Sequence, residues 1–526
     1  MAEPKQITLT IEGRQATVPE GTSMLEAAKT VGVLIPHYCY HPGLPVAGVC
    51  RMCLVEVEKA PKLAPACATA VAEGQVVHVH SEKAREARKG VLEFLLINHP
   101  LDCPICDQAG ECELQDYTYQ EGRNASRLRD AKRFNPVEDF GGDVVYVPNR
   151  CILCTRCVRF MDDVAHEPAL NVSERGDRAL VGKFEGKDLT HPWAGNVVEL
   201  CPVGALLSKD HLNKARAWEL DRAASICPNC TQGCNTIIET RDNVVVRMRP
   251  RANPDVNEYF MCDYGRLNYR WLNGPSRLDV PMIAGGGALV EAEWEPALRL
   301  AADTIRGRRI VALVSPSLSN EELFLLRRLI DRAGGTGVFR VRTGPEAPLD
   351  GVPDLALRAD RAANVVGAEL LGFSRSERPL DGLSSADVLL VADAAVGEED
   401  AAAIDRVGAI VVLATTLSPA LGRATVALPI ANVAEAEGTF TNVRGRVQRF
   451  LQAKAAPGAA RPGYFVISDL LDAIGGGGGF HLPAAVFDSL AAEHAEYRGL
   501  SYAALGLRGA MVTGAGQLAG GAEHRR

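Results

Sequence analysis

The run Cys151-Ile152-Leu153-Cys154-Thr155-Arg156-Cys157 places three thiols within seven residues, and Cys201-Pro202 follows after 43 further residues. Three thiolates in one short loop can bind one face of a cubane cluster, and a remote fourth cysteine can complete the ligand set. A structural zinc site with four cysteines usually has two separated C-x₂-C pairs instead. This stretch therefore favours a [4Fe–4S] cluster over zinc.

The remaining cysteines lie on either side of this stretch and form sets of the same kind. All 15 cysteines fall between Cys39 and Cys262. Each set has at least one tight C-x₂-C pair with one or two more distant members, a spacing typical of metal or cluster ligands rather than of a disulfide framework. The four sets are Cys39, Cys50, Cys53 and Cys67; Cys103, Cys106 and Cys112; Cys151, Cys154, Cys157 and Cys201; and Cys227, Cys230, Cys234 and Cys262.

The first set lies in a sequence context typical of a β-grasp ferredoxin. Residues 7–11 and 16–18 predict a hairpin, a capped helix follows through Ala28, and residues 54–57 predict another strand after the cysteine loop. The spacing differs from the plant-type C-x₄-C-x₂-C pattern, but this context favours a [2Fe–2S] cluster, with zinc as the alternative. The fourth set, C-x₂-C-x₃-C with a distant Cys262, favours a [4Fe–4S] cluster as the third set does.

The second set has only three cysteines, so one ligand is missing from it. His99 stands just before this set, directly after a predicted helix over 81–97. Asp102, Asp107 and Glu111 are alternatives, but imidazole is the more common ligand at a soft metal site. We therefore expect His99 to complete the second set. A neutral imidazole in place of a thiolate changes the net charge of a cluster, which is one determinant of its reduction potential.

The overall composition is that of a soluble globular protein with several domains, with 526 residues, 47% of them hydrophobic, and a net charge of −8. This charge and the absence of basic blocks argue against a nucleic-acid partner. The segment Met1–Gln6 has no features of a signal or transit peptide, and the longest uncharged run, 407–422, is too short and polar to span a bilayer. We expect a reducing cytosolic location, with any membrane attachment made through a partner.

Beyond residue 285 the sequence becomes rich in Ala, Val and Leu and alternates between two kinds of segment. Residues 310–314, 388–391 and 409–413 predict buried strands, and residues 320–333 predict an amphipathic helix. Strands that alternate with helices are typical of a parallel sheet. We find no nucleotide-binding glycine fingerprint and no nucleophile–base pair, so we predict no catalytic residue in this chain.

Two runs resemble one family closely. Residues 97–112, INHPLDCPICDQAGEC, resemble the His-Cys₃ cluster segment of the large iron–sulfur (G) subunit of bacterial NADH:quinone oxidoreductase, or respiratory complex I. Residues 150–160, RCILCTRCVRF, and 199–205, ELCPVGA, resemble the next [4Fe–4S] segment of that family. The resemblance runs in order from the N-terminal ferredoxin-like part to at least Cys262.

The resemblance implies an electron-transfer function, coupled in the whole complex to proton translocation. In the family, NADH reduces FMN on a partner subunit, and single electrons then pass through iron–sulfur clusters toward quinone. It implies one [2Fe–2S] and three [4Fe–4S] clusters here, the fourth set being a cluster found in some bacterial members. The implied partners are the FMN/NADH-binding subunit, the small 2Fe–2S subunit and downstream iron–sulfur subunits. The implied location is the peripheral arm, on the cytoplasmic side of the bacterial inner membrane.

The second half of the chain also resembles the molybdopterin oxidoreductase fold. The resemblance rests on the run CDYGR at 262–266 and the run EGTFTN at 437–442. About 260 residues follow the last cysteine, fewer than that fold needs to enclose its cofactor. No cysteine remains there to bind molybdenum, although Ser or Asp could bind it. We therefore expect a truncated α/β domain without molybdopterin.

The predicted fold is a multidomain α+β and α/β protein. The expected domains are a β-grasp 2Fe–2S ferredoxin (1–80), a His-Cys₃ 4Fe–4S domain (81–140), a bacterial-ferredoxin-like 4Fe–4S domain (141–219), a 4Fe–4S domain of molybdopterin-oxidoreductase type (220–276), a degenerate molybdopterin-oxidoreductase-like domain (277–455) and a C-terminal tail (456–526). The alternatives are an iron–sulfur subunit of a formate dehydrogenase- or hydrogenase-like complex, and a zinc-stapled scaffold.

Overall fold

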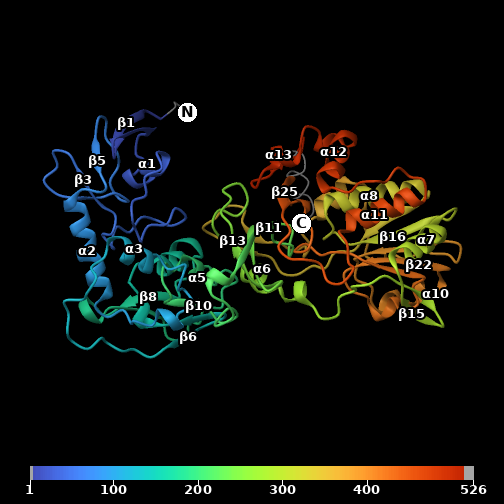
Figure 1. Cartoon of the computed structure of the whole chain (residues 1–526), viewed down its shortest axis with the longest axis horizontal. Helices are drawn as coiled ribbons and strands as arrows, with labels where there is room; N and C mark the ends of the chain where they lie inside the picture. Colours follow the sequence, from blue (N-terminus) through green and yellow to red (C-terminus); the bar gives the residue numbers. More distant parts are fainter. Residues whose placement is uncertain (1–3, 515–526) are drawn as a thin grey trace. The chain divides into compact units, whose positions relative to one another are not determined.

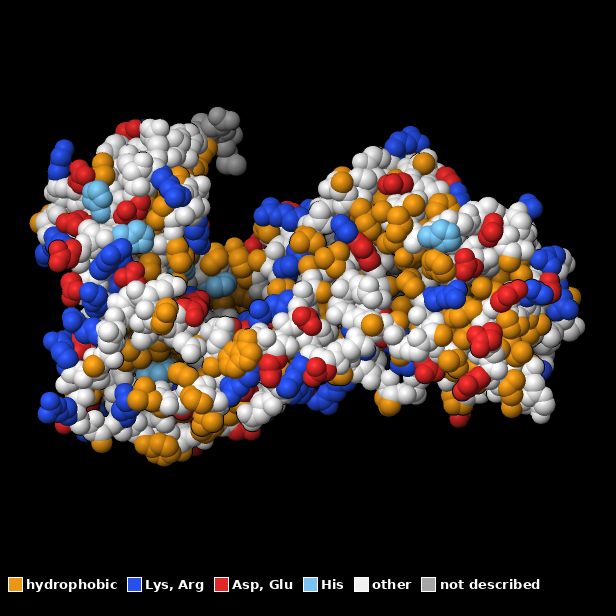
Figure 2. All heavy atoms as spheres, in the orientation of Figure 1, with side chains coloured by type: hydrophobic (Ala, Val, Ile, Leu, Met, Phe, Trp, Pro, Cys, Tyr) orange, Lys and Arg blue, Asp and Glu red, His pale blue; other side chains and the backbone are white. Residues whose placement is uncertain are grey.

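The chain forms two compact units in the computed structural model, which describes residues 4–514. The first unit runs to Leu220 and includes Leu349–Pro353, and the second comprises Asp221–Pro348 and the residues from Asp354 onward. In Figure 1 the first unit is coloured blue to green, and the second green to red. Acidic, basic and hydrophobic side chains are interspersed over the visible face of each unit (Figure 2).

The first unit begins with a five-stranded sheet in the order β2-β1-β5-β3-β4. Its elements are β1 (Gln6–Ile11), β2 (Arg14–Pro19), α1 (Met24–Thr30), β3 (Leu54–Val57), β4 (Ala64–Pro65) and β5 (Val76–His78). The predicted hairpin, helix and strand are confirmed. Ile7, Leu9 and Ile11 alternate into the core, as period-2 side chains do on a one-sided sheet, and Ser23 caps α1 by accepting from the Glu26 backbone N–H.

The rest of the first unit consists of short elements joined by loops that carry the second and third cysteine sets. They are α2 (Glu82–Leu96), α3 (Glu113–Glu121), β6 (Glu138–Gly141), β7 (Val144–Tyr146), α4 (Arg156–Arg159), β8 (Leu170–Ser173), β9 (Leu180–Lys183), α5 (Asn196–Leu200) and β10 (Leu206–Ser208). Helix α2 matches its prediction, with Ser81 as N-cap. Strand β7 lies between β10 and β6 in one antiparallel sheet.

The second unit opens with an antiparallel sheet that holds the fourth cysteine set. Its strands are β11 (Asp221–Ile226), β12 (Asn235–Arg241) and β13 (Val244–Pro250), followed by α6 (Asp263–Leu267).

An eight-stranded sheet follows in the order β15-β14-β23-β22-β21-β16-β17-β20. Its strands are β14 (Met282–Gly285), β15 (Ala288–Glu291), β16 (Ile310–Val314), β17 (Thr336–Phe339), β20 (Ser374–Arg375), β21 (Val388–Ala392), β22 (Ala409–Ala414) and β23 (Val426–Pro429). The six strands from β23 to β20 are parallel, which confirms the predicted parallel sheet. Strands β18 (Ala347–Pro348) and β19 (Ala356–Leu357) form a separate pair.

Helices cover both faces of this sheet, which explains why its central strands are apolar throughout. The helices are α7 (Trp294–Ile305), α8 (Asn320–Arg332), α9 (Val365–Leu370), α10 (Ala401–Arg406) and α11 (Gly463–Ala473). In β16, Ala312 packs in one core with α7, α8 and α11, whereas Leu313 packs in a second core with Ile404 of α10. Figure 1 shows α8 and α11 on one side of β16 and β22, and α10 on the other.

The described part of the predicted C-terminal tail is packed into the second unit. After β24 (Gly438–Thr441) and β25 (Arg446–Phe450) come α11, α12 (Pro483–Glu493), α13 (Tyr502–Leu505) and β26 (Ala510–Met511). Phe487 and Tyr497 are fully buried in the same core as α8. Strand β26 pairs with β25, so this segment completes the unit.

Candidate iron–sulfur cluster sites

The structure brings the four cysteines of the first set together in the loops between α1 and β5. Cys39, Cys53 and Cys67 are buried, and Cys50 is half-buried. The Cys39 backbone N–H donates to Cys50 Sγ at 3.5 Å. Hydrogen bonds from the Cys50 and Cys67 side chains hold the pKa of Cys39 well below its usual range. The loop therefore gathers four thiols and favours a thiolate among them, as a cluster ligand must be.

The second set lies at the ends of helices. Cys112 is the N-cap of α3, His99 follows α2, and both line a cavity of about 550 Å³ with Cys103. Cys103 is exposed, whereas Cys106 is buried and faces Gly204 so closely that a Cβ added to Gly204 would lie 2.3 Å from its sulfur. His99, Cys103 and Cys112 therefore share one cavity, whereas Cys106 does not line it and lies against Gly204.

His99 has the properties expected of a neutral imidazole ligand. Its Nδ1 atom is buried and has no hydrogen-bond partner among residues 4–514. Burial lowers the pKa of His99 to about 4, so the ring is neutral at physiological pH. An imidazole must be neutral to bind a metal, and an orphaned buried nitrogen is costly unless it meets a ligand. These observations fit a cluster at the second set.

The third set lies in one cavity lined by Cys151, Cys154, Cys157 and Cys201. Leu153 and Thr155, which separate the first three cysteines, have φ values of 53° and 59°. A bulky side chain in this left-handed region costs on the order of 1–3 kcal/mol, and such conformations cluster at functional sites. Burial raises the pKa of all four thiols, to about 11 for Cys151 and Cys201 and to about 12 for Cys154. Buried thiolates need positive charge beside them, which cluster irons would supply.

All four cysteines of the fourth set are buried. Its four cysteines are each 4% exposed, and burial raises the pKa of each thiol. Cys262 is the N-cap of α6 and accepts from the Gly265 N–H at 3.3 Å. A Cβ on Gly265 would meet the sulfurs of Cys227 and Cys262 at 3.0 and 3.5 Å. Glycine at this position leaves room beside both sulfurs, which fits a bound cluster. Among the residues that the structure describes, no group of three or more His, Cys, Asp or Glu is arranged to hold a single metal ion.

Two arginines, one between the cysteines of the third set and one just after them, connect it to the other two sets of the first unit. The buried Arg156 donates to the carbonyl oxygens of Tyr40 at 2.7 Å and Leu200 at 3.2 Å, and its ion pair with Glu113 is 3.5 Å long. Arg159 donates to the Cys39 carbonyl oxygen. Both arginines stand in the RCILCTRCVRF run, but nothing in the local sequence indicates which carbonyl oxygens they contact. They link the loops that carry the three cysteine sets.

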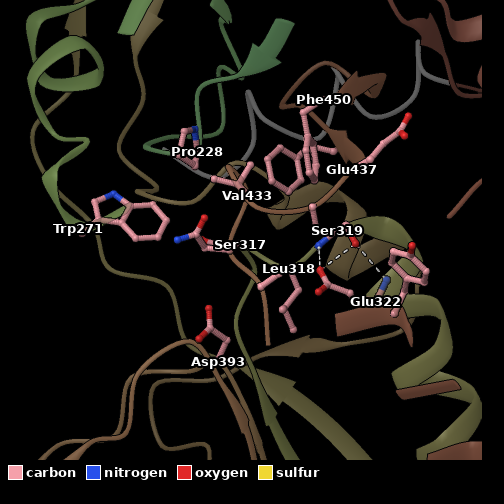
Figure 3. Close-up of a pocket in the computed structure, with 15 residues that line it drawn as sticks. Pro228, Trp271, Ser317, Leu318, Ser319, Glu322, Asp393, Val433, Glu437 and Phe450 are labelled. Atoms are coloured by element: carbon pink, nitrogen blue, oxygen red, sulfur yellow. Dashed lines mark hydrogen bonds between the residues drawn. The ribbon is translucent and has the colours of Figure 1, made fainter. Parts of the chain in front are cut away.

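The second unit has a narrow pocket at the carboxyl ends of β16 and β21, where ligands bind in open α/β sheets. Its volume is about 40 Å³, far below the 300–1,000 Å³ typical of small-molecule sites. Figure 3 shows Glu322 bonded to Ser319 at one side of the pocket and Asp393 at another. Burial raises the pKa of Glu322 to about 7 and that of Asp393 above its usual range. Acidic lining and small size do not suit a phosphate-bearing cofactor.

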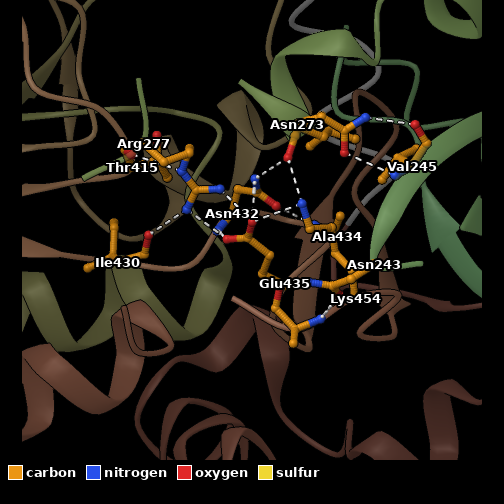
Figure 4. A network of polar contacts seen from close by, with 12 residues as sticks. Asn243, Val245, Asn273, Arg277, Thr415, Ile430, Asn432, Ala434, Glu435 and Lys454 are labelled. Carbon is orange, nitrogen blue, oxygen red and sulfur yellow. Dashed lines mark hydrogen bonds and ion pairs between the residues drawn. The ribbon is translucent and has the colours of Figure 1, made fainter. Parts of the chain in front are cut away.

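A buried ionic network holds the loops beside this pocket (Figure 4). Glu435, with a fully buried side chain, accepts from two Arg277 nitrogens and from the Asn432 backbone N–H at 3.0 Å, and Lys454 lies 3.6 Å away. Arg277 also donates to the carbonyl oxygen of Thr415 at 2.9 Å. The network joins segments that are more than 130 residues apart in sequence.

Family models match the chain in the order of its cysteine sets. The matches are a 2Fe-2S iron-sulfur cluster binding domain (4–82), the NADH-ubiquinone oxidoreductase-G iron-sulfur binding region (88–127), the ferredoxin-like domain of NADH-quinone oxidoreductase subunit 3 (141–207), the molybdopterin oxidoreductase Fe4S4 domain (221–274) and molybdopterin oxidoreductase (360–473). These domains define a class, the mixed α/β iron–sulfur proteins with ferredoxin and molybdopterin-oxidoreductase-like parts.

Curated relatives narrow this class further. The G subunit of NADH-quinone oxidoreductase from Rickettsia felis is 42% identical over 331 residues, which are 62% of this chain and 49% of the relative. The mitochondrial 78 kDa subunit of NADH-ubiquinone oxidoreductase from Candida albicans is 40% identical, over 63% of this chain and 47% of the relative. The chain is a homologue of the G subunit of NADH-quinone oxidoreductase, and the predicted resemblance is confirmed. It spans about half the length of the curated relatives that it matches.

A solved structure of an NAD⁺-reducing [NiFe]-hydrogenase in the H₂-reduced state is also similar. It is 30% identical, with a TM-score of 0.36, and the match covers 40% of this chain and 90% of that chain. Within residues 4–514, no helix has the length and apolar character needed to cross a bilayer.

Proposed function

We propose that this chain is the electron-transfer subunit of an NADH:quinone oxidoreductase, an electron carrier without a substrate site of its own. It would accept electrons from the FMN/NADH-binding subunit and pass them toward quinone, in a complex coupled to proton translocation. The observation that carries the proposal is the grouping of four ligand sets, each in a segment that matches an iron–sulfur domain model. Bound clusters supply one-electron transfer, and the chain holds them, excludes water and sets their spacing.

The proposed ligands assign one cluster to each set. A [2Fe–2S] cluster takes the first set and [4Fe–4S] clusters take the others, with the ligands Cys39, Cys50, Cys53 and Cys67; His99, Cys103, Cys106 and Cys112; Cys151, Cys154, Cys157 and Cys201; and Cys227, Cys230, Cys234 and Cys262. The small acidic pocket of Glu322 and Asp393 supports a second unit without molybdopterin.

The proposed setting is the peripheral arm of the complex, on the cytoplasmic side of a bacterial inner membrane. There the small 2Fe–2S subunit and downstream iron–sulfur subunits would be the further partners, and any membrane attachment would be theirs. Homology to the G subunit supports this setting.

The test is metal and sulfide analysis of the anaerobically purified chain, followed by low-temperature EPR after reduction. The assignment predicts about 14 iron per chain, with neither stoichiometric zinc nor molybdenum. Four single variants, Cys53→Ala, His99→Ala, Cys154→Ala and Cys230→Ala, should each remove one EPR signal and leave the other three. Zinc in place of iron would overturn the proposal in favour of a scaffold. Stoichiometric molybdenum would indicate an active site in the second unit.

A further inference from the structure

A buried hydroxyl group without a hydrogen-bond partner lies at the third cysteine set. Tyr146, the last residue of β7, is 1% exposed, and its Oη atom has no hydrogen-bond partner among residues 4–514. A buried hydroxyl is almost always paired, so a group beside this one is expected to become its partner when the site is complete.

The hydroxyl of Tyr146 faces the cavity of the third set. Tyr146 lines that cavity together with its four cysteines, and the other lining residues are mostly apolar. The hydroxyl lies beside the Cys151 thiol and interacts with it, although the pair does not have the geometry of an ordinary hydrogen bond. When the Cys151 sulfur binds a metal it becomes a thiolate, which is a stronger acceptor than a thiol.

The position of the Tyr146 ring is held on both sides. Residue 146 pairs with Leu206 in the β7–β10 ladder. The Phe140 ring packs on the Tyr146 ring with centroids 4.5 Å apart. These contacts fix the direction of the hydroxyl before it binds anything. A side chain that adjusts a metal site needs such a fixed position.

We propose that the Tyr146 hydroxyl donates a hydrogen bond to the cluster-ligating sulfur of Cys151 and raises the reduction potential of the third cluster. A donor beside a ligating sulfur stabilises the reduced cluster, which carries one more negative charge than the oxidised cluster. This inference rests on the proposed function, because it requires a [4Fe–4S] cluster at the third set.

The test is Tyr146→Phe in the full chain, with each cluster's midpoint measured by EPR-monitored redox titration. The third cluster's signal is the one that Cys154→Ala removes. We expect the oxidised-to-reduced equilibrium of that cluster to shift about tenfold toward the oxidised form, a fall of about 59 mV for one electron. The other three midpoints and the iron content should not change. Tyr497→Phe is the matched control, since its buried hydroxyl bonds to Thr441 in the second unit, and it should leave all four midpoints unchanged.

An unchanged third midpoint in Tyr146→Phe, with the cluster present, would overturn the role of Tyr146 and leave the proposed function standing. Absence of the third signal from the wild-type chain would instead overturn the proposed function. If Tyr146→Phe loses iron, the wild-type chain carrying 3-fluorotyrosine replaces it. The more acidic fluorinated hydroxyl donates more strongly, so the third midpoint should rise, and no rise would also overturn the role of Tyr146.

Discussion

The buried network of Glu435 offers a test of what holds the second unit together. The perturbation is Glu435→Gln, which removes the single negative charge of the network. Arg277 and Lys454, with side chains 7% and 10% exposed, would then be left as buried cations without their carboxylate. Because removing one partner of a buried ion pair leaves an uncompensated charge, the expected loss of stability is about 3–5 kcal/mol.

The assay is hydrogen–deuterium exchange in the intact chain, followed by mass spectrometry on peptides from β21 to β23. These strands are buried, so their exchange reports the opening of the unit. A loss of about 3–5 kcal/mol speeds exchange by roughly two to four orders of magnitude. The matched control is Glu295→Gln, because the Glu295–Arg299 pair is exposed and such pairs contribute about 0–1 kcal/mol.

The double variant Glu435→Gln/Arg277→Met separates the ion pair from the packing around it. It removes the larger orphaned cation, so it should be less destabilised than the sum of the two single variants. Two results would refute the reasoning: exchange in Glu435→Gln no faster than in the control, or a double variant whose loss equals or exceeds the sum.

Two further predictions concern the pH dependence of the second unit's stability and the close contact between Gly204 and Cys106. Burial raises the pKa of Glu322 to about 7 from its ordinary 4.5, and Glu321 shifts likewise. The folded state then holds these protons more tightly than the unfolded chain, so the second unit should lose stability as pH rises from about 4.5 to about 7. Each group contributes on the order of 3 kcal/mol to this loss. When the free energy of unfolding is measured over a pH series, Glu322→Gln should therefore remove about half of its dependence on pH. In Gly204→Ala the added Cβ would lie 2.3 Å from the Cys106 sulfur, so Cys106 should be displaced and the chain should lose about four irons. The control Gly90→Ala, whose Cβ meets nothing within 4 Å, should keep them. Full iron content in Gly204→Ala would contradict this prediction.

Local sequence predicted the elements that depend on neighbouring residues. The strand expected over 310–314 is β16, and the amphipathic helix expected over 320–333 is α8, which the structure shows to begin with a capping box of Ser319 and Glu322. A buried strand and a helix start each carry their signal within a few residues, so no tertiary knowledge is needed to recognise them. The third cysteine set also carries a local signal, because the spacing of its first three cysteines is a property of one loop.

The long-range contacts around the cysteine sets and in the second unit cannot be recognised from neighbouring residues in the sequence. Arg156 reaches a carbonyl 116 residues away, and Glu435 binds an arginine 158 residues away. Tyr146 shares a cavity with Cys151 only because the fold of β7 and the following loop brings the two residues together.

The sequence alone predicted four sets of cluster ligands and their order, because ligand chemistry and loop spacing depend on short segments of the chain. Only the tertiary structure decided that His99 is a neutral imidazole, that two arginines connect the cluster loops, and that an orphaned hydroxyl faces the third set. The physical reason is that burial and long-range polar contacts exist only after distant segments pack together, and these interactions set protonation, position and potential.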